Sequence, residues 1–154
     1  MLHLRPHHLI DIIRNIGLNR PLAPHPYGHA QHLVTRKIMD GSENEIRMVV
    51  GADDLCAPCI HLTKTGLCDD ILPQFDFPAR KQTYNDELDH RLLVFLGLRE
   101  DSTVSLPEFL WMIDNRIDEI VPLCLHPKED TTYRKEGLRR GLNILIRKTQ
   151  FPVT

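Results

Sequence analysis

The spacing of the cysteines constrains this chain more than any other feature of its sequence. Cys56 and Cys59 are separated by two residues, Cys68 follows after eight more, and Cys124 lies far along the chain. A tight Cys-x-x-Cys turn places two sulfurs on one side of the backbone, and Cys68 closes a loop back to that pair. Three thiols this close, with a fourth supplied from a distance, favour one metal centre over a set of disulfide bonds.

The spacing leaves the type of metal open. It matches neither the doubled Cys-x-x-Cys pattern of common zinc sites nor the compact cysteine run of ferredoxins. Two interpretations without a metal also stand: buried free thiols that only pack in a core, and a redox pair formed by Cys56 and Cys59. The predicted ligands are Cys56, Cys59, Cys68 and Cys124.

The composition is that of one soluble globular domain covering residues 1–154. Apolar residues make up 42% and charged residues 26% of the chain, which is enough to bury a core. No apolar run is long enough to span a membrane, and residues 1–6 lack the apolar core of a signal peptide. We therefore expect a cytoplasmic protein with no membrane partner. In that reducing compartment a Cys-x-x-Cys pair is more often a metal or redox site than a structural disulfide.

Charge is distributed unevenly along the chain. Basic residues outnumber acidic ones in residues 1–41 and 127–154, whereas acidic residues predominate in residues 42–126. Pairing between solvated helix faces explains this pattern, and a basic surface for nucleic acid is the less favoured alternative. An electron-transfer or protein partner fits a metal protein better, although the sequence does not identify one.

Apolar spacing predicts a mostly α fold with a small β-sheet (α+β), in which helices surround a cysteine-bearing metal loop. The predicted helices cover residues 7–16, 28–39, 81–96, 106–120 and 131–148. Ser105 and Glu108 have the spacing of a capping box at the start of the fourth of these helices. Three prolines predict a loop over residues 19–27.

The strand prediction is shorter. Residues 45–50 are the best strand candidate, and residues 2–5 are expected to pair with them as an edge. Residues 51–78 then form a long loop that contains three of the cysteines. A loop of this length inside a compact domain needs something to organise it, and a bound metal would do so.

Histidines and aspartates surround the predicted metal loop. His7 and His8 begin the first helix and point about 100° apart, so one of them can reach the cysteines while the other caps or packs. Asp53 and Asp54 precede the first cysteine and suit either a turn or a metal environment. His126 lies close enough to Cys124 to replace a thiolate. The residues expected around the metal are Arg5, His7, His8, Asp53, Asp54 and His126.

A second histidine group lies between the first two predicted helices. His29 and His32 are three residues apart and share a helix face. With His25 they offer an alternative metal site, against the simpler interpretation of a solvated face.

Two motifs together resemble a known family. They are Arg-Pro-His-His at residues 5–8 and Asp-Asp-x-Cys-x-x-Cys at residues 53–59, followed by Cys68, Leu-Gly-Leu at 96–98 and Cys124. The chain resembles the domain-of-unknown-function family twelve eighty-four, small bacterial and archaeal proteins described as predicted iron–sulfur proteins. The family has a cysteine where this chain has Asp11, and it ends with a second cysteine pair where this chain has only Cys124.

The resemblance implies an iron–sulfur cluster (4Fe-4S), with zinc as the alternative cofactor, and it implies no particular reaction. Two other functions stay open. One is a zinc-stabilised interaction module, in which the metal only holds the loop. The other is an enzyme with an open coordination position near Arg5, His7, His8 and Asp53. The sequence contains no phosphate-binding loop, nucleophile elbow or His-Glu-x-x-His motif.

Overall fold

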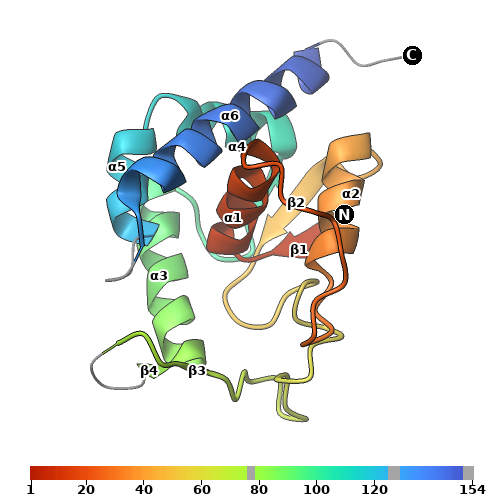
Figure 1. Ribbon diagram of the computed structural model, residues 1–154, viewed down its shortest axis with the longest axis vertical. Helices are drawn as coiled ribbons and strands as arrows, with labels where there is room; N and C mark the ends of the chain where they lie inside the picture. Colours follow the sequence, from red (N-terminus) through yellow and green to blue (C-terminus); the bar gives the residue numbers. More distant parts are fainter. Residues whose placement is uncertain (76–78, 125–128, 151–154) are drawn as a thin grey trace.

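The computed structural model describes residues 1–75, 79–124 and 129–150 and confirms the α+β prediction. Helices form most of the described part of the chain (Figure 1). They are α1 (Pro6–Gly17), α2 (Gln31–Asp40), α3 (Lys81–Leu96), α4 (Leu106–Asp114), α5 (Ile117–Cys124) and α6 (Thr131–Gln150). The strands are β1 (Leu2–Leu4), β2 (Glu45–Met48), β3 (Ile71–Leu72), β4 (Ala79–Arg80) and β5 (Thr103–Ser105).

The larger sheet has the strand order β1-β2-β5. β1 pairs with β2 in parallel, and β5 pairs with β2 antiparallel. The predicted edge pairing of the N-terminus is therefore confirmed, whereas β5 was missed because the sequence interpretation used Ser105 only as a helix cap. β3 and β4 form a separate antiparallel pair inside the region predicted to be one long loop.

α1 lies at the centre of the fold, between the sheet and α6 (Figure 1). Its first residue is Pro6, which lacks the amide hydrogen that a helix start leaves unpaired. Its apolar side chains are buried, among them Leu9, Ile12, Ile13 and Ile16. The predicted apolar face of this helix thus packs in the core of the protein.

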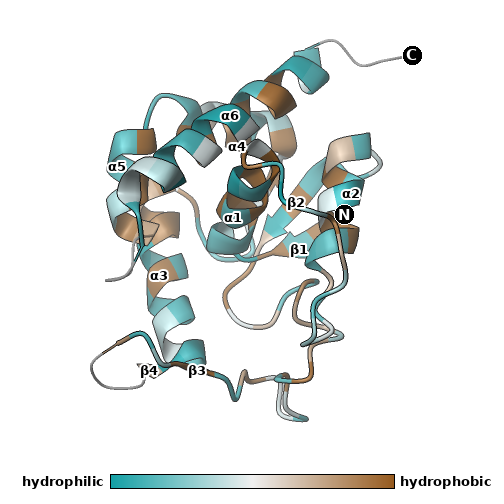
Figure 2. Cartoon of the chain, in the orientation of Figure 1, coloured by the Kyte–Doolittle hydropathy of each residue, from teal (hydrophilic) through white to brown (hydrophobic). Residues whose placement is uncertain are grey.

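α1 and α6 approach each other so closely that their contact requires glycine. A Cβ atom at Gly17 would overlap the carbonyl oxygen of Gly137, and one at Gly141 would overlap the carbonyl oxygen of Ile13. Since backbone is the obstacle, a side chain could be accommodated only by moving one helix. Figure 2 shows α6 as a mainly hydrophilic helix with apolar residues interspersed, and Leu138, Leu142 and Leu145 are the apolar residues that it buries.

Two helix boundaries differ from prediction. The second helix begins at Gln31 rather than Gly28, because Gly28 has φ +74°, a left-handed conformation outside the helical region. The predicted helix over residues 106–120 is two helices that are separated at Asn115. The amide of Arg116 bonds to the carbonyl of Ile113, and its side chain donates to the carbonyl of Phe95 at 3.1 Å, which fixes the break.

The remaining helix boundaries lie within two residues of prediction, except that α5 continues to Cys124 rather than ending at residue 120, and β2 ends at Met48 rather than at residue 50. The capping box at Ser105 and Glu108 is present, and α3 ends at Gly97 with φ +69°. No helix within the described residues is both long and apolar enough to cross a bilayer.

Candidate metal centre

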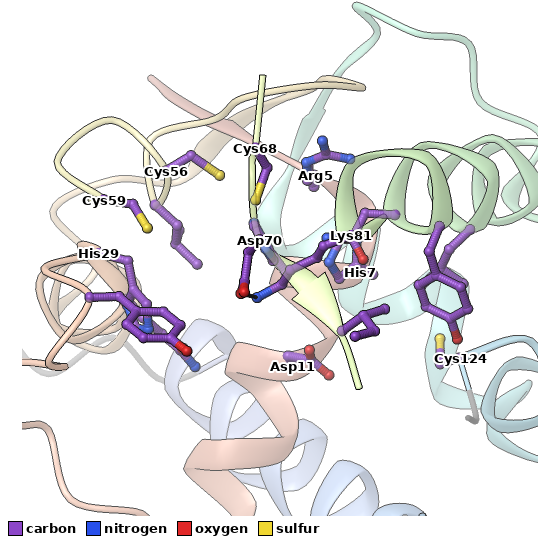
Figure 3. A pocket seen from close by; sticks show the side chains of 18 of the residues that line it. Arg5, His7, Asp11, His29, Cys56, Cys59, Cys68, Asp70, Lys81 and Cys124 are labelled. Carbon is purple, nitrogen blue, oxygen red and sulfur yellow. Dashed lines mark hydrogen bonds and ion pairs between the residues drawn. The ribbon is translucent and has the colours of Figure 1, made fainter. Parts of the chain in front are cut away.

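All four cysteines line one cavity of about 410 Å³ between α1, α3, α6 and the cysteine loop, which we define as residues 51–70. All four are free thiols. Cys56, Cys59 and Cys68 lie together on one side of the cavity, and Cys124 lies on the opposite side (Figure 3). The structure thus brings the four predicted ligands to one cavity but groups only three of them.

The cysteine loop folds through short-range hydrogen bonds. The amide of Cys59 donates to the carbonyl of Cys56 at 2.8 Å, which closes the Cys-x-x-Cys turn. An antiparallel bridge joins Leu62 to Cys68, and the turn between them passes through Gly66 with φ +80°. This turn returns Cys68 toward the first two cysteines, as the sequence predicted.

Three further hydrogen bonds attach the cysteine loop to its surroundings. The amide of Cys68 donates to Gln82 Oε1 on α3 at 2.7 Å. The amide of Ile60 donates to the carbonyl of Tyr27, and the carbonyl of Leu55 accepts from the amide of Ala30. Backbone and amide groups, rather than apolar packing, therefore position most of this loop.

Asp53 is the main anchor at the start of the loop. Its Oδ1 accepts from the amides of Leu55 and Cys56 at 3.0 and 3.2 Å. Its Oδ2 accepts from the amide of Arg5 at 2.9 Å and from Nδ1 of His8 at 2.7 Å. Burial alone would raise the pKa of Asp53, but His8 and the amide of Arg5 hold it well below its usual range. A buried carboxylate with four donors is fully used as an acceptor.

Asp89 on α3 accepts hydrogen bonds from His7, as Asp53 does from His8. Its Oδ1 accepts from the amide and from Nδ1 of His7 at 3.0 and 2.8 Å. Its Oδ2 accepts from Nη1 of Arg5 at 2.8 Å, while Nη2 of Arg5 pairs with Asp86 at 2.9 Å. Burial lowers the pKa of His7, so this imidazole is neutral and Nδ1 carries the proton that Asp89 accepts.

The Arg-Pro-His-His motif is therefore a junction. It connects β1 to α1, binds the cysteine loop through Asp53, and binds α3 through Asp89. Arg5 is only 2% exposed, so its charge is neutralised inside the protein. This accounts for a buried arginine at the start of the central helix.

One group of side chains in the described residues is compact enough to hold a single ion. A ring nitrogen of His8, a carboxylate oxygen of Asp53 and the sulfur of Cys56 lie within 4.8 Å of one another. No three of the cysteines meet the same limit. Burial and the charge of Asp53 raise the pKa of Cys56 to about 12, so this thiol becomes a thiolate only when a cation compensates it.

Cys124 belongs to a different environment. It ends α5, is buried, and has Arg134 and Asp11 as its charged neighbours. Burial raises the pKa of this thiol to about 12 despite the nearby guanidinium of Arg134. Arg134 also binds Asp11 at 2.9 Å and pairs with Glu129, which links α1 to α6. A role of Cys124 as a ligand stays a prediction.

The other predicted residues are placed as follows. Asp54 accepts from the amide of His3 at 2.8 Å and does not line the cavity. His29 lines the cavity and stacks on His25 at 4.2 Å, but neither joins a compact ligand group with His32 in the described chain. His126 lies outside the described residues.

Four contributors to the site were missed by sequence reasoning. Asp89 and Asn85 stand on the buried face of α3 in line with Leu92, and a carboxylate within an apolar stripe was the available signal. Gln82 and Arg134 gave no such signal, because a polar residue near a helix start is ordinarily solvated. Comparison of the chain with protein-family models, curated proteins and solved structures found no match.

Proposed function

We propose that this chain is a metal-binding protein that holds one iron–sulfur cluster, of the 4Fe-4S type, against the cysteine loop. The observation that carries the proposal is the convergence of Cys56, Cys59 and Cys68 on one side of a 410 Å³ cavity. The resemblance of the Arg-Pro-His-His and Asp-Asp-x-Cys-x-x-Cys motifs to predicted iron–sulfur proteins supports the same occupant.

The spacing of the thiols favours a cluster over one zinc ion. Sulfurs bound to a single zinc at 2.3 Å lie about 3.8 Å apart in a tetrahedral site. The thiols of the cysteine loop do not form a triplet within 4.8 Å, whereas a cluster distributes its thiolates over separate irons. The donor set is also suitable, since soft thiolates select iron–sulfur clusters.

A bound cluster would supply one-electron transfer. The chain contributes the surroundings that tune such a group, namely charge, hydrogen bonds and burial. Arg5 and Lys81 line the same cavity, and Lys81 is held by Asp70 at 3.1 Å. Positive charge beside a set of thiolates stabilises their ionised form.

A mononuclear metal is the second candidate, and one observation favours it. His8, Asp53 and Cys56 offer ligand atoms within 4.8 Å of one another. Against it, all four acceptor positions of Asp53 already bind hydrogen-bond donors. A metal at either oxygen of Asp53 would have to displace one of these donors, and leaving a buried donor unpaired costs about 1–3 kcal/mol.

Metal analysis of anaerobically purified protein separates these proposals. About four iron and four sulfide per chain, with a broad visible absorption band, is the expected result for the cluster. One zinc or iron without sulfide would support the mononuclear site instead. A metal-free protein with four reactive thiols would overturn both.

A further inference from the structure

His8 lies in the cavity beside one of the three grouped thiols. Cys124 is separated from them by the width of the cavity (Figure 3). Its charged neighbours include Arg134 and Asp11. His8 lines the same cavity, and one of its ring nitrogens lies within 4.8 Å of the Cys56 sulfur. Among the described residues, His8 is the imidazole that forms a compact ligand group with one of these thiols.

The hydrogen bond to Asp53 determines which nitrogen of His8 is available. Nδ1 donates to the carboxylate at 2.7 Å, because an ionised carboxylate can only accept. With Nδ1 bound to Asp53, Nε2 is the ring nitrogen left to bind a metal. No hydrogen bond among the described residues involves this atom, and the side chain is 19% exposed. Carboxylate-bound histidines of this kind are the usual metal-ligating form, since the carboxylate fixes the tautomer and raises the basicity of the ligand.

His7 provides an internal comparison. It has the same Nδ1 bond to a carboxylate, but its ring is 9% exposed and is not part of the compact group with Cys56. Asp89 attaches it to α3, whereas Asp53 attaches His8 to the cysteine loop itself. The loop and His8 are therefore positioned by the same carboxylate.

We infer that His8, through Nε2, is the fourth protein ligand of the cluster beside Cys56, Cys59 and Cys68, with Asp53 as the residue that positions it. This inference rests on the proposed function. It assigns no metal bond to Cys124, whose thiol belongs to the Arg134 environment. The cluster would then have one nitrogen and three sulfur ligands. Replacing thiolate by imidazole raises the reduction potential of a cluster.

The first test reads the ligand directly in the unaltered protein. The protein is produced with ¹⁵N-labelled histidine, purified without oxygen and reduced, and its cluster is studied by pulsed electron paramagnetic resonance. A hyperfine coupling to one directly bound histidine nitrogen is expected. Its absence in protein that contains iron and sulfide would overturn the inference and leave the proposed cluster intact. Protein without iron and sulfide would overturn both.

Variants then identify the histidine. His8→Cys is expected to retain iron and sulfide, to lose the nitrogen coupling and to have a more negative reduction potential. Cys124→Ser and the exposed-site control His90→Ala are expected to retain the coupling, the potential and the metal content. A coupling that survives in His8→Cys, or loss of the cluster in Cys124→Ser, would show that His8 is not the fourth ligand. Because the first test uses the unaltered chain, misfolding of a variant cannot conceal the answer.

Discussion

The cysteine loop and the helical wall formed by α1, α3 and α6 face each other across the cavity, but different forces hold them in place. The helical wall is built on buried apolar side chains and on a glycine-mediated contact between α1 and α6. The cysteine loop has only Leu55 among the buried apolar residues and is positioned by hydrogen bonds from carboxylate, amide and backbone groups. The helical wall is therefore rigid on its own, whereas the cysteine loop should depend on the proposed metal for its rigidity.

The largest expected effect concerns the helical wall. Gly141→Ala places a methyl group on the carbonyl oxygen of Ile13, so α6 must move away from α1. Overpacking against backbone should cost about 3 kcal/mol or more of unfolding free energy, measured by urea denaturation. Asn143→Ala on the exposed side of α6 is the matched control and should be neutral or slightly stabilising. A nearly unchanged midpoint for Gly141→Ala would mean that the close contact is not required.

The next effect concerns the anchor of the cysteine loop. Asp53→Ala leaves the amides of Arg5 and Leu55 without their acceptor and frees His8, while the amide of Cys56 keeps only its bond to the backbone carbonyl of residue 53. The cost should be about 2 kcal/mol, because buried donors are left unpaired. The variant should also lose most of its bound metal.

Asp54→Ala is the matched control for that experiment. Asp54 is partly exposed and accepts one amide hydrogen bond, from His3. Its removal should cost less than about 1 kcal/mol and leave the metal content unchanged. Equal metal loss in the two variants would contradict the anchoring role assigned to Asp53.

Much of the helical wall was predictable because its forces are periodic in sequence. The apolar spacing in α1, α3 and α6 and the capping signals of Ser105 and Gly97 gave helices close to those observed. β5 was not predictable in this way, since three residues are too few for a pattern and only pairing with β2 defines them. The division between α4 and α5 depends on Arg116 reaching Phe95, which is a tertiary contact.

The site was predictable only in part for the same reason. Cys56, Cys59 and Cys68 are close in sequence, so the turn chemistry of one loop brings them together. Cys124 depends on where α5 ends relative to that loop, and residue spacing carries no information about this. Asp89 accepts a hydrogen bond from His7, which lies more than eighty residues earlier in the chain, and only the packing of α3 on α1 brings the two together.

Under the proposed function, removing the metal should speed hydrogen exchange in the cysteine loop more than in the helical wall. We expect amides of residues 51–70 to exchange at least about tenfold faster in the metal-free protein, since a tenfold change corresponds to about 1.4 kcal/mol of local opening. Amides in the middle of α1 and α6 should change much less. Uniform acceleration over both walls would contradict the contrast and indicate that the metal stabilises the whole fold. Residues 31–40 in α2 serve as an internal reference, because this helix contributes none but Gln31 to the cavity lining.

The smallest expected effect is the electrostatic contribution of Asp11, on α1 of the helical wall, to the free energy of unfolding. Burial alone would raise the pKa of Asp11, but Arg14 and Arg134 hold it below its usual range. Because the folded pKa lies below the unfolded value, the unfolded chain takes up the proton first as pH falls. The stabilising contribution of Asp11 is therefore complete above the unfolded pKa, near pH 4, and is lost as pH falls through the lower folded pKa.

Asp11→Asn isolates this contribution. At pH 7 the variant should lose about 1 kcal/mol, because the side chain is 29% exposed and solvent screens its ion pairs. The difference from the unaltered protein should shrink as the pH is lowered below about 4 and disappear once Asp11 is protonated in both states. Denaturant midpoints of both proteins across this pH range provide the measurement. A difference in midpoint that is independent of pH would mean that Asp11 stabilises the packing of α1 against α6 by hydrogen bonding alone. The charge of Asp11 would then contribute nothing to the stability of the helical wall.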